Sequence, residues 1–74
     1  MKLLTECSKG SKVVVSKLHA SGALKQRLIS LGIMKHAEIS VLAYTAAKST
    51  VEIKVGKMQL ALRKEEADLI EVVA

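Results

Sequence analysis

Residues 51–63 read VEIKVGKMQLALR, and this stretch decides the fold. Positions 51, 53 and 55 are valine or isoleucine and alternate with charged residues, and positions 60 and 62 are leucines separated by one alanine. A period of two is typical of strands with one buried face. Gly56-Lys57 lies between the two runs and is typical of a tight hairpin turn. The stretch predicts an antiparallel hairpin over an aliphatic core, with Met58 inside that core.

Shorter runs outside this hairpin extend the predicted sheet. Residues 12–18 follow a turn signal at Gly10-Ser11 and contain three consecutive valines, which burial of both faces or a bulge near Lys17 would explain. Alternation resumes at Ile39 and Val41, and residues 46–49 predict a turn before the hairpin. Residues 70–73 predict a last short strand.

A helix is predicted where residues 21–32 change period. Leucines at positions 24, 28 and 31 fall on one face of a helix. Ser21 is a suitable N-cap because its hydroxyl can accept a hydrogen bond from a free amide of the first turn. Gly32 suits the position just past the helix end, where the backbone often adopts a left-handed conformation. Ile33 can then make an apolar contact with Leu28.

These elements predict a mainly β protein. It has about five short strands, one helix after the first strand and a short helical turn at residues 64–69 before the last strand. Short strands hide their edges best when a sheet closes into a barrel. An SH3-like barrel is the first expectation and an OB-like barrel the second. The 74 residues contain no linker, so residues 1–74 are expected to form one domain.

Charge is unevenly distributed along the chain. Residues 1–64 hold 12 basic and 3 acidic residues, whereas residues 65–74 hold 4 acidic residues and no basic one. Singly spaced lysines usually form a solvated face. A basic docking surface for nucleic acid or an acidic partner is the alternative. The first residues, MKLLTE, do not fit a signal peptide, and a lone cysteine fits a reducing compartment, so we expect a cytoplasmic protein.

The sequence offers no recognisable catalytic arrangement. It lacks a nucleophile elbow and a phosphate-binding loop, and the adjacent Glu65 and Glu66 should diverge on a helical turn. Cys7, His19 and His36 match no zinc-binding spacing. We expect no enzymatic activity, no metal and no cofactor, with Cys7 as a small core residue. A metal shared between molecules through His19 or His36 is the alternative.

Tyr44 is the only aromatic residue. Single-stranded nucleic acids bind by stacking bases on aromatic side chains, and grooves for proline-rich peptides also need an aromatic lining. We therefore expect a protein partner, bound through aliphatic surface, charge or a strand edge, and neither nucleic acid nor a small-molecule substrate. An oligomerising module joined through a strand edge is a further alternative.

The order of these signals resembles the FeoA family along almost the whole chain. The pair RLISLGI at residues 27–33 and LALRKEEADLI at residues 60–70 carries most of the resemblance. Gly10 before the first strand and the strand start at residues 38–41 also match. The sequence departs from the family pattern at His36, where a second glycine is usual, at residues 46–50 and at Cys7, where the family tends to have a leucine.

The resemblance implies an SH3-like barrel with an accessory or regulatory function in bacterial ferrous iron transport. It also implies contact with the cytoplasmic part of FeoB, the membrane transporter for ferrous iron, which would bring the protein to the inner face of the membrane. Metal-dependent repressors carry a similar barrel at their C-terminus. A barrel of that repressor type is therefore an alternative, as is a basic barrel that binds nucleic acid.

Five residues are predicted to contact a partner. Met34, Lys35 and His36 form an exposed turn after the helix. Tyr44 is a candidate because tyrosine is enriched at binding hot spots. Arg27 lies between the leucines of the helix, where a structural contact of its head with a carbonyl or a glutamate is the first interpretation and partner contact the second.

Overall fold

The structure is a computed structural model that describes residues 2–74. Short strands alternate with short helices over these residues, and no helix among them is long and apolar enough to cross a membrane. The elements are β1 (Lys2–Leu3), η1 (Leu4–Glu6), β2 (Lys12–Leu18), α1 (Gly22–Ser30), β3 (Glu38–Tyr44), η2 (Ala46–Lys48), β4 (Thr50–Val55), β5 (Met58–Arg63), α2 (Lys64–Ala67) and β6 (Ile70–Val73).

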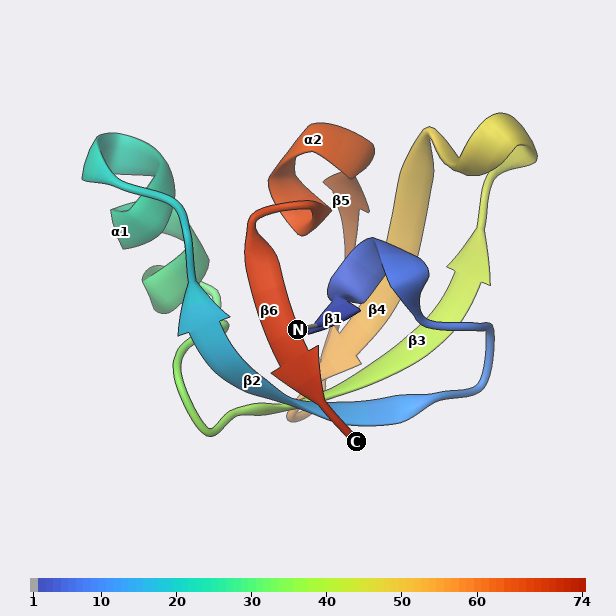
Figure 1. Cartoon of the computed structure of the whole chain (residues 1–74), viewed down its shortest axis with the longest axis horizontal. Coiled ribbons are helices and arrows are strands. Elements are labelled where there is room, and N and C mark those ends of the chain that lie inside the picture. Colours follow the sequence, from blue (N-terminus) through green and yellow to red (C-terminus); the bar gives the residue numbers. More distant parts are fainter. Residues whose placement is uncertain (1) are drawn as a thin grey trace.

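All strands belong to one antiparallel sheet in the order β1-β6-β2-β3-β4-β5. The sheet curls around a central interior, and α1 stands outside it on one side (Figure 1). β1 and β5 are the two ends of the sheet. The short helix α2 contacts β4, β5 and η1, and η1 in turn contacts β6. These two helices therefore connect the ends of the curled sheet.

The predicted mainly β architecture is confirmed, with one addition. Within residues 2–74 there are six strands rather than about five, because Lys2 and Leu3 pair with Val72 and Glu71 at the outer side of β6. A two-residue strand is too short to show a period of two. The sequence therefore gives no local signal for β1, which exists only through its pairing with the far end of the chain.

The interior is aliphatic, as the alternation predicts. In the hairpin β4–β5, Val51, Ile53 and Leu62 are buried. No polar or charged residue within the described chain is buried. The prediction that Met58 is a core residue is wrong, because its side chain is 46% exposed. The inward face of β5 passes from buried Leu62 through half-buried Leu60 to exposed Met58, whereas Val55, which pairs with Met58, is buried. The start of the edge strand β5 therefore lies outside the core.

Helix α1 packs through the predicted leucine stripe. Leu28 is fully buried, and the leucines at 24 and 31 pack against the core. After the helix, Gly32 has a φ of 91° and the amide of Ile33 donates to the carbonyl of Leu28 at 2.9 Å. This bond and the burial of Ile33 confirm the predicted helix end. Ser21 precedes the helix, but its hydroxyl caps no amide, so the predicted side-chain cap is wrong.

Two irregularities bend the strands. The register of β2 against β6 shifts between Val15 and Lys17, which confirms the bulge near Lys17, one of the two explanations offered for the consecutive valines. A second shift, between Val41 and Ala43 of β3, was not predicted. A bulge bends its strand and increases the local twist. Both bulges therefore help a small sheet to curl around its core.

Candidate functional site

The turn between α1 and β3 separates two surface pockets. Residues at both ends of the turn line one pocket, and Met34 and Lys35 line the other. Backbone hydrogen bonds fix the turn against β2. The amide of His36 donates to the carbonyl of Val15 at 2.8 Å, and the amide of Val15 donates to the carbonyl of Ala37 at 2.9 Å. The two pockets are therefore positioned by the same rigid backbone.

The first candidate site is a cleft between α1, the turn and the outer face of β2. Its volume is about 420 Å³. We call it the lysine cleft, and it is lined by Ser16, Lys17, Leu18, Lys25, Ile29, Met34 and Lys35. Three elements that are separate in the sequence thus meet at one surface.

The lysine cleft combines an apolar floor with a basic rim. Leu18 and Ile29 are half-buried, and the side chain of Met34 is 43% exposed. The three lysines form no ion pair within residues 2–74. Exposed methionine adapts its shape to a bound surface, and uncompensated lysines attract acidic groups. The cleft suits a protein surface that presents an apolar side chain among acidic ones.

Two of the five predicted contact residues meet in this cleft. Met34 and Lys35 line it, whereas His36, Arg27 and Tyr44 do not. His36 is exposed on the turn and has a φ of 78°, a left-handed conformation that histidine adopts more readily than most residues. Its backbone amide is held by Val15, so its imidazole is the part available to a partner.

Arg27 makes a structural contact. Its Nη1 donates to Oε2 of Glu66 at 2.6 Å, and so it links α1 to α2. The guanidinium side chain is nevertheless 58% exposed. The first interpretation of Arg27 from the sequence, a head group bonded to a glutamate, agrees with this geometry. Contact with a partner stays a prediction for the exposed part of the side chain.

Tyr44 uses its hydroxyl within the protein. The hydroxyl donates to the carbonyl of Cys7 and lies 3.4 Å from the carbonyl of Leu4, so it ties the N-terminal segment to the end of β3. Burial, followed by the neighbouring Cys7, raises the pKa of Tyr44 above its ordinary value. Lys48 places its ammonium 4.8 Å from the ring centre. A docking function for Tyr44 stays a prediction.

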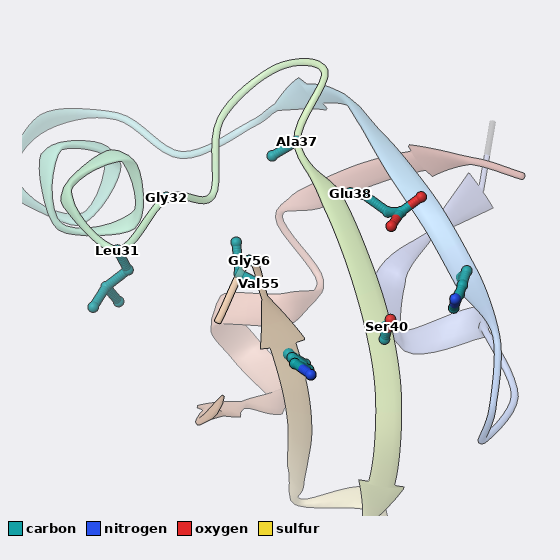
Figure 2. A pocket seen from close by; sticks show the side chains of 9 residues that line it. Leu31, Gly32, Ala37, Glu38, Ser40, Val55 and Gly56 are labelled. Carbon is teal, nitrogen blue, oxygen red and sulfur yellow. The ribbon is translucent and has the colours of Figure 1, made fainter. Parts of the chain in front are cut away.

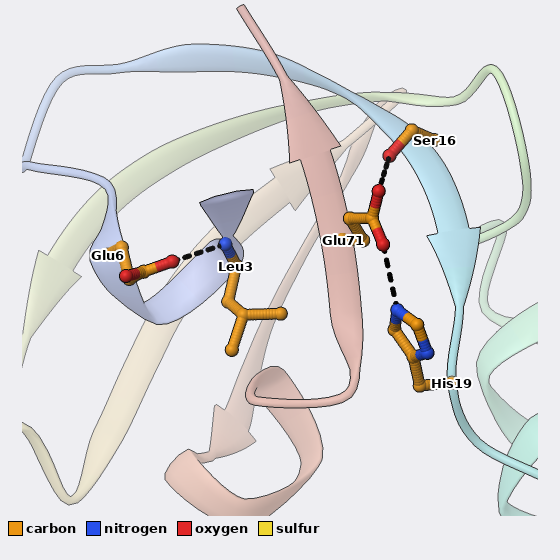
Figure 3. A network of polar contacts seen from close by, with 5 residues as sticks. All are labelled: Leu3, Glu6, Ser16, His19 and Glu71. Carbon is orange, nitrogen blue, oxygen red and sulfur yellow. Dashed lines mark hydrogen bonds and ion pairs between the residues drawn. The ribbon is translucent and has the colours of Figure 1, made fainter. Parts of the chain in front are cut away.

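His19, a candidate metal ligand, is paired with a carboxylate. Its Nε2 lies 2.8 Å from Oε1 of Glu71, and the hydroxyl of Ser16 donates to Oε2 of the same carboxylate at 3.4 Å (Figure 3). The hydrogen bond from His19 is the main reason that the pKa of Glu71 is lowered. Among residues 2–74, no three histidine, cysteine or acidic side chains are arranged to hold a metal ion. The shared-metal hypothesis stays untested.

Cys7 is fully buried, which confirms its prediction as a core residue. Burial is the main cause that raises the pKa of its thiol. The thiolate is the nucleophile and the metal ligand. A buried thiol with a raised pKa therefore fits packing rather than chemistry.

The second pocket lies on the outer face of the sheet. Its volume is about 530 Å³. We call it the sheet pocket, and it is lined by Lys12, Leu31, Gly32, Ala37, Glu38, Ser40, Lys54, Val55 and Gly56. Figure 2 shows Glu38 and Ser40 along β3, and Leu31, Gly32, Val55 and Gly56 on the opposite side of the pocket. The pocket thus has a polar part on the strands and an apolar part at the helix end.

Only a weak sequence signal exists for the other residues of these pockets. Ile29 is apolar but falls beside the buried leucine stripe of α1, and that position is the one available signal for the lysine cleft. Lys12 and Lys54 are far apart in sequence and become neighbours of Ser40 only through strand pairing. Their proximity therefore depends on the tertiary structure.

The curled antiparallel sheet and the helix that follows its first long strand define a small β-barrel domain of the SH3-like class. The model of the FeoA domain matches residues 2–74. The chain therefore belongs to the FeoA family.

Similar proteins agree with this assignment. A protein of Campylobacter jejuni that carries the name Fe(2+) transport protein A is 30% identical over 69 residues, which are 93% of each chain. The zinc complex of Stenotrophomonas maltophilia FeoA is described as a procaryotic SH3 domain protein. Its sequence is 28% identical to this one, and the two structures superimpose with a TM-score of 0.85 over 99% of this chain and 91% of the FeoA chain. The predicted SH3-like fold is thereby confirmed.

The solution structure of iron(II) transport protein A from Clostridium thermocellum is 31% identical, with a TM-score of 0.90 over 96% of this chain. This chain matches 44% of the length of that one. A manganese-dependent transcriptional repressor also superimposes, with a TM-score of 0.89 but 22% identity. The likeness to the repressor shows a shared fold alone.

Proposed function

We propose that this protein is an accessory protein of ferrous iron transport that acts by contact with the cytoplasmic part of a FeoB-type transporter, not by catalysis. Membership of the FeoA family supports the transport context. The observation that carries the docking step is the lysine cleft, where exposed Met34 lies among three lysines without ion pairs in the described chain. A transporter surface with an apolar side chain beside acidic ones would complement it.

Nucleic acid is the less favoured partner. Base stacking supplies about 1–3 kcal/mol per base in single-strand binders. Here the single aromatic residue, Tyr44, is half-buried, bonded through its hydroxyl and covered on one face by Lys48. The basic surface would thus bind phosphates without any base contact. Such binding would be weak and would fall steeply with salt.

The decisive experiment measures binding of the full chain to the purified cytoplasmic domain of the FeoB-type transporter of the same organism. Met34→Ala should weaken binding about fivefold, since a half-exposed methionine loses roughly 1 kcal/mol of apolar contact. Met58→Ala is a matched control, because Met58 is exposed to a similar extent, 46% against 43%, and lies outside the lysine cleft. Met58→Ala should change binding less than about twofold, because most surface residues outside a binding hot spot contribute little to affinity.

Transport provides the second measurement. A strain that lacks this chain should take up ferrous iron more slowly, and the wild-type and Met58→Ala chains should restore uptake better than Met34→Ala. Normal uptake in the deletion strain, together with no binding to the transporter domain, would refute the proposed function. Equal loss from both methionine variants would instead show that the contact lies outside the lysine cleft.

A further inference from the structure

The sheet pocket contains a row of polar side chains in strict register. Lys12 of β2 pairs with Ser40 of β3, and Ser40 pairs on its other side with Lys54 of β4. All three point away from the core, because their neighbours Val13, Ile39, Val41, Ile53 and Val55 are buried. Residues paired across strands lie about 5 Å apart. Two lysines therefore flank one hydroxyl on a rigid sheet.

Neither lysine of this row is neutralised. Lys12 and Lys54 form no ion pair within the part of the chain that the structure describes. The nearest acidic residue of the pocket, Glu38, lies two positions from Ser40 on the same strand and is also without an ion pair there. An anion that enters between the two lysines can accept hydrogen bonds from both ammonium groups and from the Ser40 hydroxyl.

The rest of the sheet pocket is apolar and hollow. Leu31, Ala37 and Val55 line this part, and Gly32 and Gly56 leave it without further side chains. A Cβ on Gly56 would meet nothing within 4 Å. A Cβ on Gly32 would lie 3.3 Å from Cγ1 of Val55, so the room for an apolar side chain lies on the Gly56 side of the hollow.

We propose that the sheet pocket binds an extended peptide segment in which a glutamate or aspartate and an aliphatic residue stand two positions apart, so that both side chains point to the same side. The carboxylate of the peptide lies between Lys12 and Lys54 and accepts a hydrogen bond from the Ser40 hydroxyl. The aliphatic side chain of the peptide enters the hollow beside Val55. An exposed charge pair contributes only about 0.2–1 kcal/mol. A free anion would therefore be held poorly, and the adjoining apolar contact is what makes a peptide the better occupant.

This inference goes beyond contact with the transporter, because the sheet pocket is separate from the lysine cleft and shares no lining residue with it. Its test also needs no transporter. The ¹⁵N-labelled full chain is titrated with an acetylated and amidated hexapeptide that carries Glu-Ala-Leu at its centre, which places the two contacting side chains on one face. Chemical-shift changes should map to the amides of Ser40, Lys54 and Gly56. A peptide with Gln-Ala-Leu at its centre should bind at least about threefold more weakly, the size of one exposed charge contact.

Charge variants sharpen the test. Lys12→Ala and Lys54→Ala should each weaken binding about threefold to fivefold, by the scale of exposed ion pairs. Lys9→Ala is the matched control, since it removes the same charge from an exposed position outside the pocket. It should change affinity less than about 1.5-fold at moderate salt, where distant charges are screened. Glu38→Gln should strengthen binding by removing a like charge.

Four outcomes would overturn the proposal. They are equal binding of the Glu-Ala-Leu and Gln-Ala-Leu peptides, equal effects of the Lys9 and Lys54 variants, shifts that map to the lysine cleft, or failure of the peptide when an oligothymidylate shifts the same amides. The last result would assign the pocket to nucleic acid. The spectrum of each variant reports its folding, so loss of binding cannot be confused with loss of structure.

Discussion

Arg27 and Glu66 join the two α-helices of the described chain. Nη1 of Arg27 in α1 lies 2.6 Å from Oε2 of Glu66 in α2, across 39 residues of sequence. The other oxygen of the same carboxylate accepts the backbone amide of Arg63 at 3.0 Å, which caps the start of α2. One glutamate therefore both begins a helix and fixes it to another.

Replacing these two residues should have unequal effects on stability. Arg27→Ala should lower the free energy of unfolding by about 0.5 kcal/mol, because it removes one exposed ion pair. Glu66→Ala should lower it by roughly 1.5 kcal/mol, because the helix cap is lost as well. Urea unfolding followed by circular dichroism measures both values. Glu65→Ala is the control, and a larger cost for Arg27→Ala than for Glu66→Ala would contradict this account.

Tyr44→Phe should separate a structural function of the hydroxyl from a docking one. The change removes the hydrogen bond to the carbonyl of Cys7 and should cost about 1 kcal/mol of unfolding free energy. Affinity for the transporter domain should stay within about twofold, since hot-spot losses are larger. In the wild-type chain, titration of the phenol by ultraviolet absorbance should have its midpoint above pH 10.0, because burial raises the pKa. A large loss of affinity in Tyr44→Phe would instead establish Tyr44 as a contact residue.

Gly32→Ala should destabilise the end of α1. Gly32 has a φ of 91°, and an added Cβ would lie 3.3 Å from Cγ1 of Val55. The backbone strain and this tight contact should together cost about 2 kcal/mol. Gly56→Ala is a matched comparison, with a positive φ but nothing within 4 Å of the added atom, and should cost about 1 kcal/mol. Equal costs measured by thermal unfolding would mean that the contact with Val55 relaxes freely.

Acid should destabilise the fold through two carboxylates. The hydrogen bond from His19 lowers the pKa of Glu71 below its ordinary 4.5, and the hydrogen bonds from Thr5 and Lys64 lower the pKa of Asp68 below its ordinary 3.8. A group whose pKa is lower in the folded state stabilises the fold fully above its ordinary value. That stabilisation is lost as the pH falls through the lowered pKa.

The melting temperature should therefore fall as the pH drops below about 4.5, the ordinary pKa of Glu71. Glu71→Gln and Asp68→Asn should melt lower than the wild-type chain at pH 7 and show a smaller further loss toward pH 2.5. Glu52→Gln, on an exposed strand position with no side-chain hydrogen bond among residues 2–74, is the control. Parallel curves for Glu71→Gln and the wild-type chain would show that the pair with His19 does not contribute.

Several elements could be predicted because their signals are local. The hairpin around Gly56 and the leucine stripe of α1 need only a period and a turn residue, and both are confirmed. Met58 shows the limit of this reasoning. Its period matches that of buried Leu62, but periodicity assigns a face of a strand and does not say how far the core extends along it. Only the packed structure shows that the hairpin end lies outside.

Sequence alone determined the alternation of strands with one early helix and the glycine that ends this helix, because each depends on residues near one another in the chain. It also determined the family of the protein, because the family motifs follow one another in order along the chain. Tertiary structure alone decided that Lys12, Ser40 and Lys54 stand side by side, that the N-terminal pair forms a strand against β6, and that α1, the turn and β2 enclose the lysine cleft. Such relationships are set by strand register and by the curl of the sheet. Both are fixed by burying the whole aliphatic core at once, which no short stretch of sequence specifies.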